Sequence, residues 1–85
     1  MSLHLVFSRA GFKACMQRKV ADDAVILLAD GVYCLNIAEG DNVHILEIDA
    51  KVRGISVPSH GAKPIDYADF VVLTEAHNPI VSWAD

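Results

Sequence analysis

Apolar residues along this chain fall into short runs separated by segments of helical periodicity. Runs at residues 3–7, 24–29 and 43–48 predict three strands. The uninterrupted run at 24–29 is typical of a strand that is covered on both faces of a parallel sheet. Shorter apolar stretches predict two further strands, at 64–65 and 80–83.

Helices are expected between the first strands. Ser8 is in position to cap a helix over residues 9–20, because a serine oxygen accepts a hydrogen bond from a free N–H of the first turn. Four apolar residues recur at helical spacing on one face of this segment: Phe12, Cys15, Met16 and Val20. After a turn at Asp30-Gly31, residues 32–37 predict a short helix that ends within 39–42.

The second half of the chain also alternates between predicted strands and predicted helices. Asp49 is expected to cap a single helical turn that stops at Gly54, and residues 55–63 are expected to form an exposed loop. Asp66 predicts the cap of a last helix, with Asp69 as a second carboxylate at the positive end of the helix dipole.

This last helix should present an apolar face to the sheet and end at Asn78-Pro79. Phe70 and Leu73 supply that face, with Val71 and Val72 less regularly placed. The complete alternation predicts one domain over residues 1–85 of the α/β class. It is a small layer with a mostly parallel sheet flanked on both faces by helices, in a flavodoxin-like alternation. Folds of this kind host many chemistries, so the pattern does not identify the function.

Size and composition point to an assembly. The chain has 85 residues, of which 53% are apolar. A domain this small buries only roughly 60–65% of its unfolded surface and is marginally stable alone. An apolar chain of this length without a disulfide framework is expected to complete its core at a subunit interface, either with copies of itself or with other proteins.

The charge distribution argues against several functions. The net charge is −4, and no basic stripe is present, which argues against nucleic-acid binding. The cluster of Arg9, Lys13, Arg18 and Lys19 is interpreted as a solvated helix face. The five glycines are scattered and form no phosphate-binding loop, so no nucleotide or other cofactor is expected.

No leader sequence is recognised in residues 1–7, and the apolar run at 24–29 is too short to cross a membrane, so a cytoplasmic location is expected. The two cysteines should therefore be free thiols. Their spacing and that of the four histidines matches no metal site, so no metal is expected. The histidines also show no pairing with a nucleophile, and only His60 is expected to lie on an exposed loop.

Cys15 is the strongest candidate for a reactive side chain. Its place on the apolar face with Phe12 predicts a buried core thiol, because free cysteine is among the most buried residue types. A catalytic role would require an accessible and partly ionised sulfur that accepts a sulfane sulfur as a persulfide. The cations Lys13, Arg18 and Lys19 would favour ionisation if they faced this sulfur.

Cys34 and Trp83 are the other candidates. Cys34 falls in the first turns of the helix expected after Asp30-Gly31, where the dipole can lower a thiol pKa, but it is interpreted as a small apolar core residue. Trp83 has two open interpretations: an anchor at an interface with a partner, or an aromatic that folds back on its own sheet.

Four short motifs carry a resemblance to a known family. They are Leu3-His4-Leu5, the segment 27–33 with Asp30-Gly31, the Asp-x-x-x-Arg-Gly of residues 49–54, and the segment 66–74 followed by Trp83. The last, Asp-Tyr-x-Asp-Phe-Val-x-Leu-Thr, is the most specific. In this order they resemble the DsrH/TusB family of sulfur-relay subunits. Cys15 stands where DsrH-type sequences carry a cysteine in the first helix.

The resemblance implies a subunit of a DsrEFH or TusBCD type complex, in which persulfide sulfur passes between cysteines of successive proteins. Its implied partners are DsrE/TusD-like and DsrF/TusC-like subunits and a DsrC/TusE-like carrier. The main carrier cysteine is expected on the DsrE/TusD-like subunit, so this chain would be mainly structural and at most a sulfurtransferase subunit through Cys15. The sulfur would serve tRNA 2-thiouridine synthesis or sulfur oxidation. The alternative is a standalone, homo-oligomeric interaction module without sulfur transfer activity.

Overall fold

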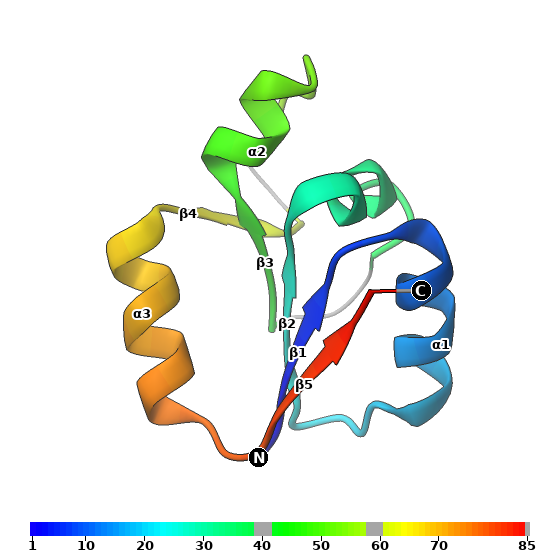
Figure 1. Ribbon diagram of the computed structural model, residues 1–85, viewed down its shortest axis with the longest axis vertical. Coiled ribbons are helices and arrows are strands. Elements are labelled where there is room, and N and C mark those ends of the chain that lie inside the picture. Colours follow the sequence, from blue (N-terminus) through cyan, green and yellow to red (C-terminus); the bar gives the residue numbers. More distant parts are fainter. Residues whose placement is uncertain (39–41, 58–60, 85) are drawn as a thin grey trace.

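Five parallel strands form a single sheet in the order β4-β3-β2-β1-β5 (Figure 1). The computed structural model describes residues 1–38, 42–57 and 61–84. The strands are β1 (Leu3–Val6), β2 (Ala24–Leu27), β3 (Val43–Leu46), β4 (Lys63–Ile65) and β5 (Ile80–Trp83). The helices are α1 (Arg9–Arg18), the 3-10 helix η1 (Ala29–Cys34), α2 (Glu47–Val52) and α3 (Tyr67–Ala76). The predicted α/β fold with a parallel sheet is confirmed.

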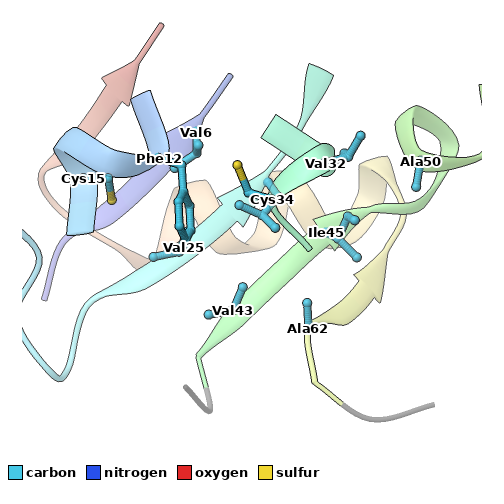
Figure 2. Packing of buried hydrophobic residues seen from close by; sticks show 11 residues of the cluster. Val6, Phe12, Cys15, Val25, Val32, Cys34, Val43, Ile45, Ala50 and Ala62 are labelled. Atoms are coloured by element: carbon cyan, nitrogen blue, oxygen red, sulfur yellow. The ribbon is translucent and has the colours of Figure 1, made fainter. Parts of the chain in front are cut away.

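Two apolar clusters cover the two faces of the sheet. One lies beneath α1, η1 and α2, and Figure 2 shows it with Phe12 and Cys15 on α1 and Cys34 on η1. The other lies on the opposite face, where Phe70 and Leu73 of α3 pack against it. All four residues of β2 are fully buried, as the continuous apolar run predicted. Helices on both faces are therefore confirmed.

The first and last strands are neighbours. β1 pairs with β2 on one side and with β5 on the other, so that Val6 lies in register with both Leu27 and Trp83. Residues close to the two ends of the chain consequently share one part of the sheet. This arrangement places Trp83 of β5 beside residues of β1 that are almost eighty positions away in the sequence.

Side-chain caps begin α1 and α3 as predicted. The Ser8 Oγ accepts a hydrogen bond from the Gly11 amide at 2.9 Å. The Asp66 carboxylate accepts one from the Asp69 amide at 2.8 Å, and the Asp69 carboxylate accepts one from the Asp66 amide at 3.3 Å. These reciprocal bonds form a capping box that satisfies amides with no partner within the helix.

The segment after β2 differs from the prediction of a turn followed by a helix at 32–37. Asp30 and Gly31 lie inside η1, which begins at Ala29 with a φ of 50°. The Ala29 amide donates a 2.7 Å hydrogen bond to the carboxylate of Asp49, which is distant in sequence. The predicted end of this helix falls partly on residues 39–41, outside the described residues.

The boundary between β3 and α2 also differs from the prediction. β3 ends at Leu46, and α2 begins at Glu47, so the strand is shorter than residues 43–48. The cap position is Leu46, and Asp49 lies within α2, where its carboxylate accepts the hydrogen bond of the Ala29 amide at the start of η1 and not one from its own helix. The prediction that Asp49 caps this turn is wrong, because a contact between distant segments uses its side chain.

The end of α1 and the start of β4 also differ from the predicted boundaries. α1 ends at Arg18, so Val20 lies beyond the apolar face and is exposed. In the loop predicted over 55–63, Ala62 is buried and Lys63 already belongs to β4. The predicted exposed His60 lies outside the described residues.

Candidate functional site

Cys15 lies on the side of α1 that faces the sheet. Its side chain is fully buried within the cluster that includes Phe12 and Val25. Burial raises the pKa of the Cys15 thiol to about 11, because a thiolate loses its hydration there. Nearby Lys19 acts in the opposite direction, and Asp23 adds to the increase. In this conformation Cys15 is a protonated core thiol.

Cys34 has a different environment. It is the last residue of η1, so the prediction that it sits in the first turns of a helix is wrong. Burial raises the pKa of its thiol, and the charge of Arg9 opposes that shift. The side chain is buried, as expected for a small apolar core residue.

A pocket of about 680 Å³ opens between α1 and η1. Its lining combines apolar and aromatic side chains with two cations and contains no carboxylate: Arg9, Phe12, Lys13, Met16, Gln17, Tyr33, Cys34, Asn36 and Ile37. The Arg9 guanidinium lies over the Tyr33 ring, 5.5 Å from its centre, which is a cation–π contact. Cys34 borders this pocket, whereas Cys15 is not part of its lining.

The α1 cations are thus divided between two surroundings. Arg9 and Lys13 line the pocket, whereas Arg18 is an exposed residue in the last turn of α1. The interpretation of all these cations as one solvated face therefore holds for only part of the cluster. The sequence could not separate them because the second wall of the pocket, η1, comes from another segment.

Native thiol labelling should reflect this difference between the two cysteines. At pH 8, three pH units below a pKa of about 11, only about one Cys15 thiol in a thousand is ionised. We expect Cys34 to react with an aromatic disulfide reagent before Cys15, and both to react far faster in denaturant. Cys15→Ala and Cys34→Ala variants identify each reaction by mass. Faster native labelling of Cys15 than of Cys34 would contradict the geometry.

A buried polar network joins β1, β2 and β5, and the sequence patterns did not predict it. Asp23, directly before β2, accepts hydrogen bonds from the amides of Ser2 and Val20 at 3.0 and 3.2 Å. His4 lies 2.9 Å from the same carboxylate through Nε2. The Trp83 indole donates a 2.9 Å hydrogen bond to His4 Nδ1. Three distant segments are therefore joined by one chain of hydrogen bonds.

The hydrogen-bond donors in this network determine which tautomer the His4 ring adopts. An indole N–H can only donate, so His4 Nδ1 must be the acceptor and the ring proton must sit on Nε2, directed at Asp23. The Asp23 carboxylate receives three hydrogen bonds, and the one from His4 is the main cause that lowers the Asp23 pKa to about 2. Both His4 and Asp23 are buried.

Trp83 therefore folds back on its own sheet, which confirms one of the two interpretations left open for it. Its ring stacks on His4 with centres 6.0 Å apart and packs against the core cluster. His44 and His77 make local contacts. His77 Nδ1 lies 2.9 Å from the Leu73 carbonyl at the end of α3, and His44 contacts Asn42 at 3.3 Å.

Replacing Trp83 with phenylalanine should lower the free energy of unfolding by about 1–2 kcal/mol. The apolar packing is largely kept, but His4 Nδ1 becomes a buried acceptor without its donor. Urea unfolding followed by circular dichroism measures the change. Tyr67→Phe, which removes a hydroxyl from an exposed aromatic, is the matched control and should change stability little. Equal effects of the two substitutions would contradict a role for the Trp83–His4 bond.

The described residues offer no metal-binding cluster and no membrane span. Within 1–38, 42–57 and 61–84, no three His, Cys, Asp or Glu side chains gather as a metal site would require. Over the same ranges, no helix is long and apolar enough to cross a bilayer.

The fold and the pocket together define the class of protein. It is a small parallel α/β domain with two buried thiols and an apolar, cationic pocket. The family model described as "DsrH like protein" matches residues 6–80, which is most of the chain. The chain belongs to the DsrH family, as its motifs predicted. No curated protein matches it. Membership of this family points to a subunit of a sulfur-relay complex that works with other subunits.

Proposed function

We propose that this chain is a structural and docking subunit of a sulfur-relay complex and that the main carrier cysteine lies on a partner. The observation that carries this proposal is the state of Cys15. In a family that serves sulfur relay, its thiol is fully buried and its pKa is raised to about 11. A carrier thiol must be accessible and partly ionised to accept sulfur. The burial of Cys15 therefore favours a structural role for this chain over a role as sulfur carrier.

The proposed partners are DsrE/TusD-like and DsrF/TusC-like subunits, with a DsrC/TusE-like protein as the next carrier. The small core and the apolar residues exposed on α3 support assembly with other chains. The sulfur delivered by the complex would enter tRNA 2-thiouridine synthesis or sulfur oxidation.

A sulfur-handling role for Cys15 remains a prediction, and it would require the following exchange reaction. The Cys15 thiolate would attack the outer sulfur of a partner's persulfide. The S–S bond of that persulfide would break, a new S–S bond would form on Cys15, and the partner's thiolate would leave. No external oxidant is needed. This step requires a conformation, within the complex, that exposes Cys15 to the partner.

Sulfur loading tests the proposal directly. The protein is incubated with a cysteine desulfurase and cysteine, alone and with DsrE-like and DsrF-like subunits, and intact masses are then measured. We expect stable binding to these subunits, with sulfur added mainly to the DsrE-like protein. Cys15→Ala and Cys34→Ala variants assign any sulfur found on this chain. Absence of sulfur on Cys15 in both settings would eliminate the carrier role, and failure to bind either subunit would eliminate the relay proposal itself.

A second candidate function is an interaction module without sulfur transfer. The burial of both cysteines favours it. Under this function, the chain would be a standalone module that associates with copies of itself and binds neither a DsrE-like nor a DsrF-like subunit. Stable binding to either subunit would exclude it.

A further inference from the structure

Arg9 and Lys13 are placed where positive charge is unfavourable for their own helix. Arg9 is the first residue of α1, at the positive end of the helix dipole, and the first turn of α1 contains no acidic residue. Lys13 follows four residues later, so the two cations lie on the same face of the helix and repel each other. Both side chains are exposed. Neither charge therefore helps α1 to form.

No carboxylate compensates these two charges within the part of the chain that the structure describes. The ion pairs of residues 1–38, 42–57 and 61–84 are His4–Asp23, Lys51–Glu47 and Arg53–Asp30. The Arg9 guanidinium instead lies over the Tyr33 ring, 5.5 Å from its centre. A cation–π contact adds no negative charge, so the positive charge of α1 remains uncompensated. An anion from outside the chain would be attracted to this face.

The pocket beside these cations is apolar and has the size of a small-molecule site. Its volume is about 680 Å³, and ligand pockets typically measure roughly 300–1,000 Å³. Phe12 lines it together with Met16 and Ile37, which are 36% and 64% exposed. Figure 2 shows Phe12 of α1 and Cys34 of η1 between the two helices. The pocket therefore presents apolar side chains to water in a concave surface, as sites for apolar ligands do.

A few polar groups in the same lining define which ligand fits. Gln17 and Asn36 contribute amides beside the two cations, and the lining formed by the described residues holds no Asp or Glu. The charge of Arg9 reaches Cys34 in the pocket wall, where it opposes the increase in thiol pKa caused by burial. A guanidinium is suited to a carboxylate because its N–H groups match the two oxygens. The complementary ligand combines an apolar body with a carboxylate.

We propose that the α1–η1 pocket binds a small amphipathic anion, a free molecule with an aliphatic or aromatic body and one carboxylate. Its body packs against Phe12, Met16 and Ile37, and its carboxylate lies at Arg9 and Lys13. A neutral apolar molecule leaves the two cations uncompensated, and a purely polar anion leaves the apolar lining in water, so neither fits as well. This site goes beyond the relay proposal and requires neither cysteine chemistry nor a partner subunit.

Calorimetric titration with three ligands of equal chain length tests the site. The probes are decanoate, its neutral counterpart decanol and its cationic counterpart decylammonium, each at neutral pH, low salt and a concentration below micelle formation. We expect decanoate to bind at least about tenfold more tightly than decanol, and decylammonium to bind most weakly. Added salt should weaken the binding of decanoate and leave that of decanol unchanged, because salt screens exposed charges.

Neutral substitutions on α1 show which charges act. Arg9 and Lys13 are exposed and neither caps the helix, so Arg9→Met and Lys13→Met should fold normally. Each should weaken decanoate binding at least about fivefold while decanol binding stays the same. Arg18→Met is the matched control, because it removes the same charge from α1 outside the pocket lining and should leave both affinities unchanged.

Thiol labelling locates the ligand. Cys34 borders the pocket and Cys15 is not part of its lining, so saturating decanoate should slow the labelling of Cys34 at least about fivefold more than that of Cys15. Mass measurement on the wild type follows both thiols in one sample, and Cys15 serves as the internal control for any general stabilisation of the fold. Equal slowing of the two thiols would place the ligand elsewhere and overturn the proposal.

Other results would also overturn it. Equal affinities for decanoate and decanol would do so, as would an equal loss of decanoate binding in Arg18→Met and Arg9→Met. If decanoate did not bind up to millimolar concentration and Arg9→Met weakened binding to a DsrE-like or DsrF-like subunit, a partner protein would occupy the pocket. The ligand proposal would then fail while the relay proposal stood.

Discussion

Replacing Gly31 with alanine should lower the free energy of unfolding by about 3 kcal/mol or more. A Cβ at this position would lie 2.1 Å from the carbonyl oxygen of Val6 and 2.9 Å from its carbon. These are backbone atoms of β1, and that carbonyl also accepts the hydrogen bond of the Leu28 amide, so it cannot move aside freely. Forcing extra atoms into close-packed structure typically costs about 1–3 kcal/mol, and more where backbone must shift.

An effect of this size matters for so small a domain. Stability of about 0.05–0.15 kcal/mol per residue gives a total of roughly 4–13 kcal/mol for a chain of this length. Urea unfolding followed by circular dichroism measures the loss, and complete loss of the folded state is also consistent with the prediction. Gly54→Ala is the control, because its added Cβ meets nothing within 4 Å. Its φ of 70° makes it cost about 1 kcal/mol through backbone strain alone. Equal losses in the two variants would contradict the predicted clash.

Replacing Asp23 with asparagine should cost about 2–3 kcal/mol at pH 7. The buried carboxylate accepts hydrogen bonds from two amides and from His4, and bonds to a charged acceptor contribute more than neutral ones. An asparagine amide group would direct an N–H at one of these donors. The exposed neighbour Asp22 provides the matched control, since Asp22→Asn removes a charge without breaking the network.

The same substitution should change the pH dependence of stability. The Asp23 pKa is lowered from 3.8 to about 2 in the folded protein, so the unfolded chain binds its proton first as the pH falls. The stabilisation by Asp23 is therefore complete above about pH 4 and is lost between about pH 4 and pH 2. Unfolding free energies of the wild type and Asp23→Asn should converge over this range. A difference that stays constant down to pH 2 would show that Asp23 acts only through its shape.

Both predictions concern contacts that the sequence could not reveal. His4 lies within an apolar run, and Asp23 is the second of two aspartates that directly precede the apolar run at 24–29. They meet because β1 and β2 pair in parallel, and Trp83 joins them because β5 pairs with the other edge of β1. A single signal was available: a histidine in a strand that is otherwise apolar needs a polar partner when it is buried.

Local chemistry was more predictable than contacts between segments. Ser8 and Asp66 begin helices because each side chain bonds an amide within three residues, which the sequence alone specifies. Asp49 resembled these caps in sequence, but the approach of Ala29 gave its carboxylate another partner. Likewise, Asp30-Gly31 was interpreted as a turn, whereas Gly31 lies within η1. A glycine is required there because the backbone of η1 passes so close to Val6 of β1 that a Cβ would clash.

The sequence by itself determined the α/β class, the buried central strand, the capped helices and the family, because these depend on periodicity, on local hydrogen bonding and on short motifs. The tertiary structure decided the environment of each chemical group. It separated Cys15 in the core from Cys34 beside the pocket, divided the α1 cations between pocket and solvent, and joined His4, Asp23 and Trp83. Burial, charge and hydrogen bonding depend on which distant segments the parallel sheet brings together, and the order of residues along the chain does not specify those neighbours.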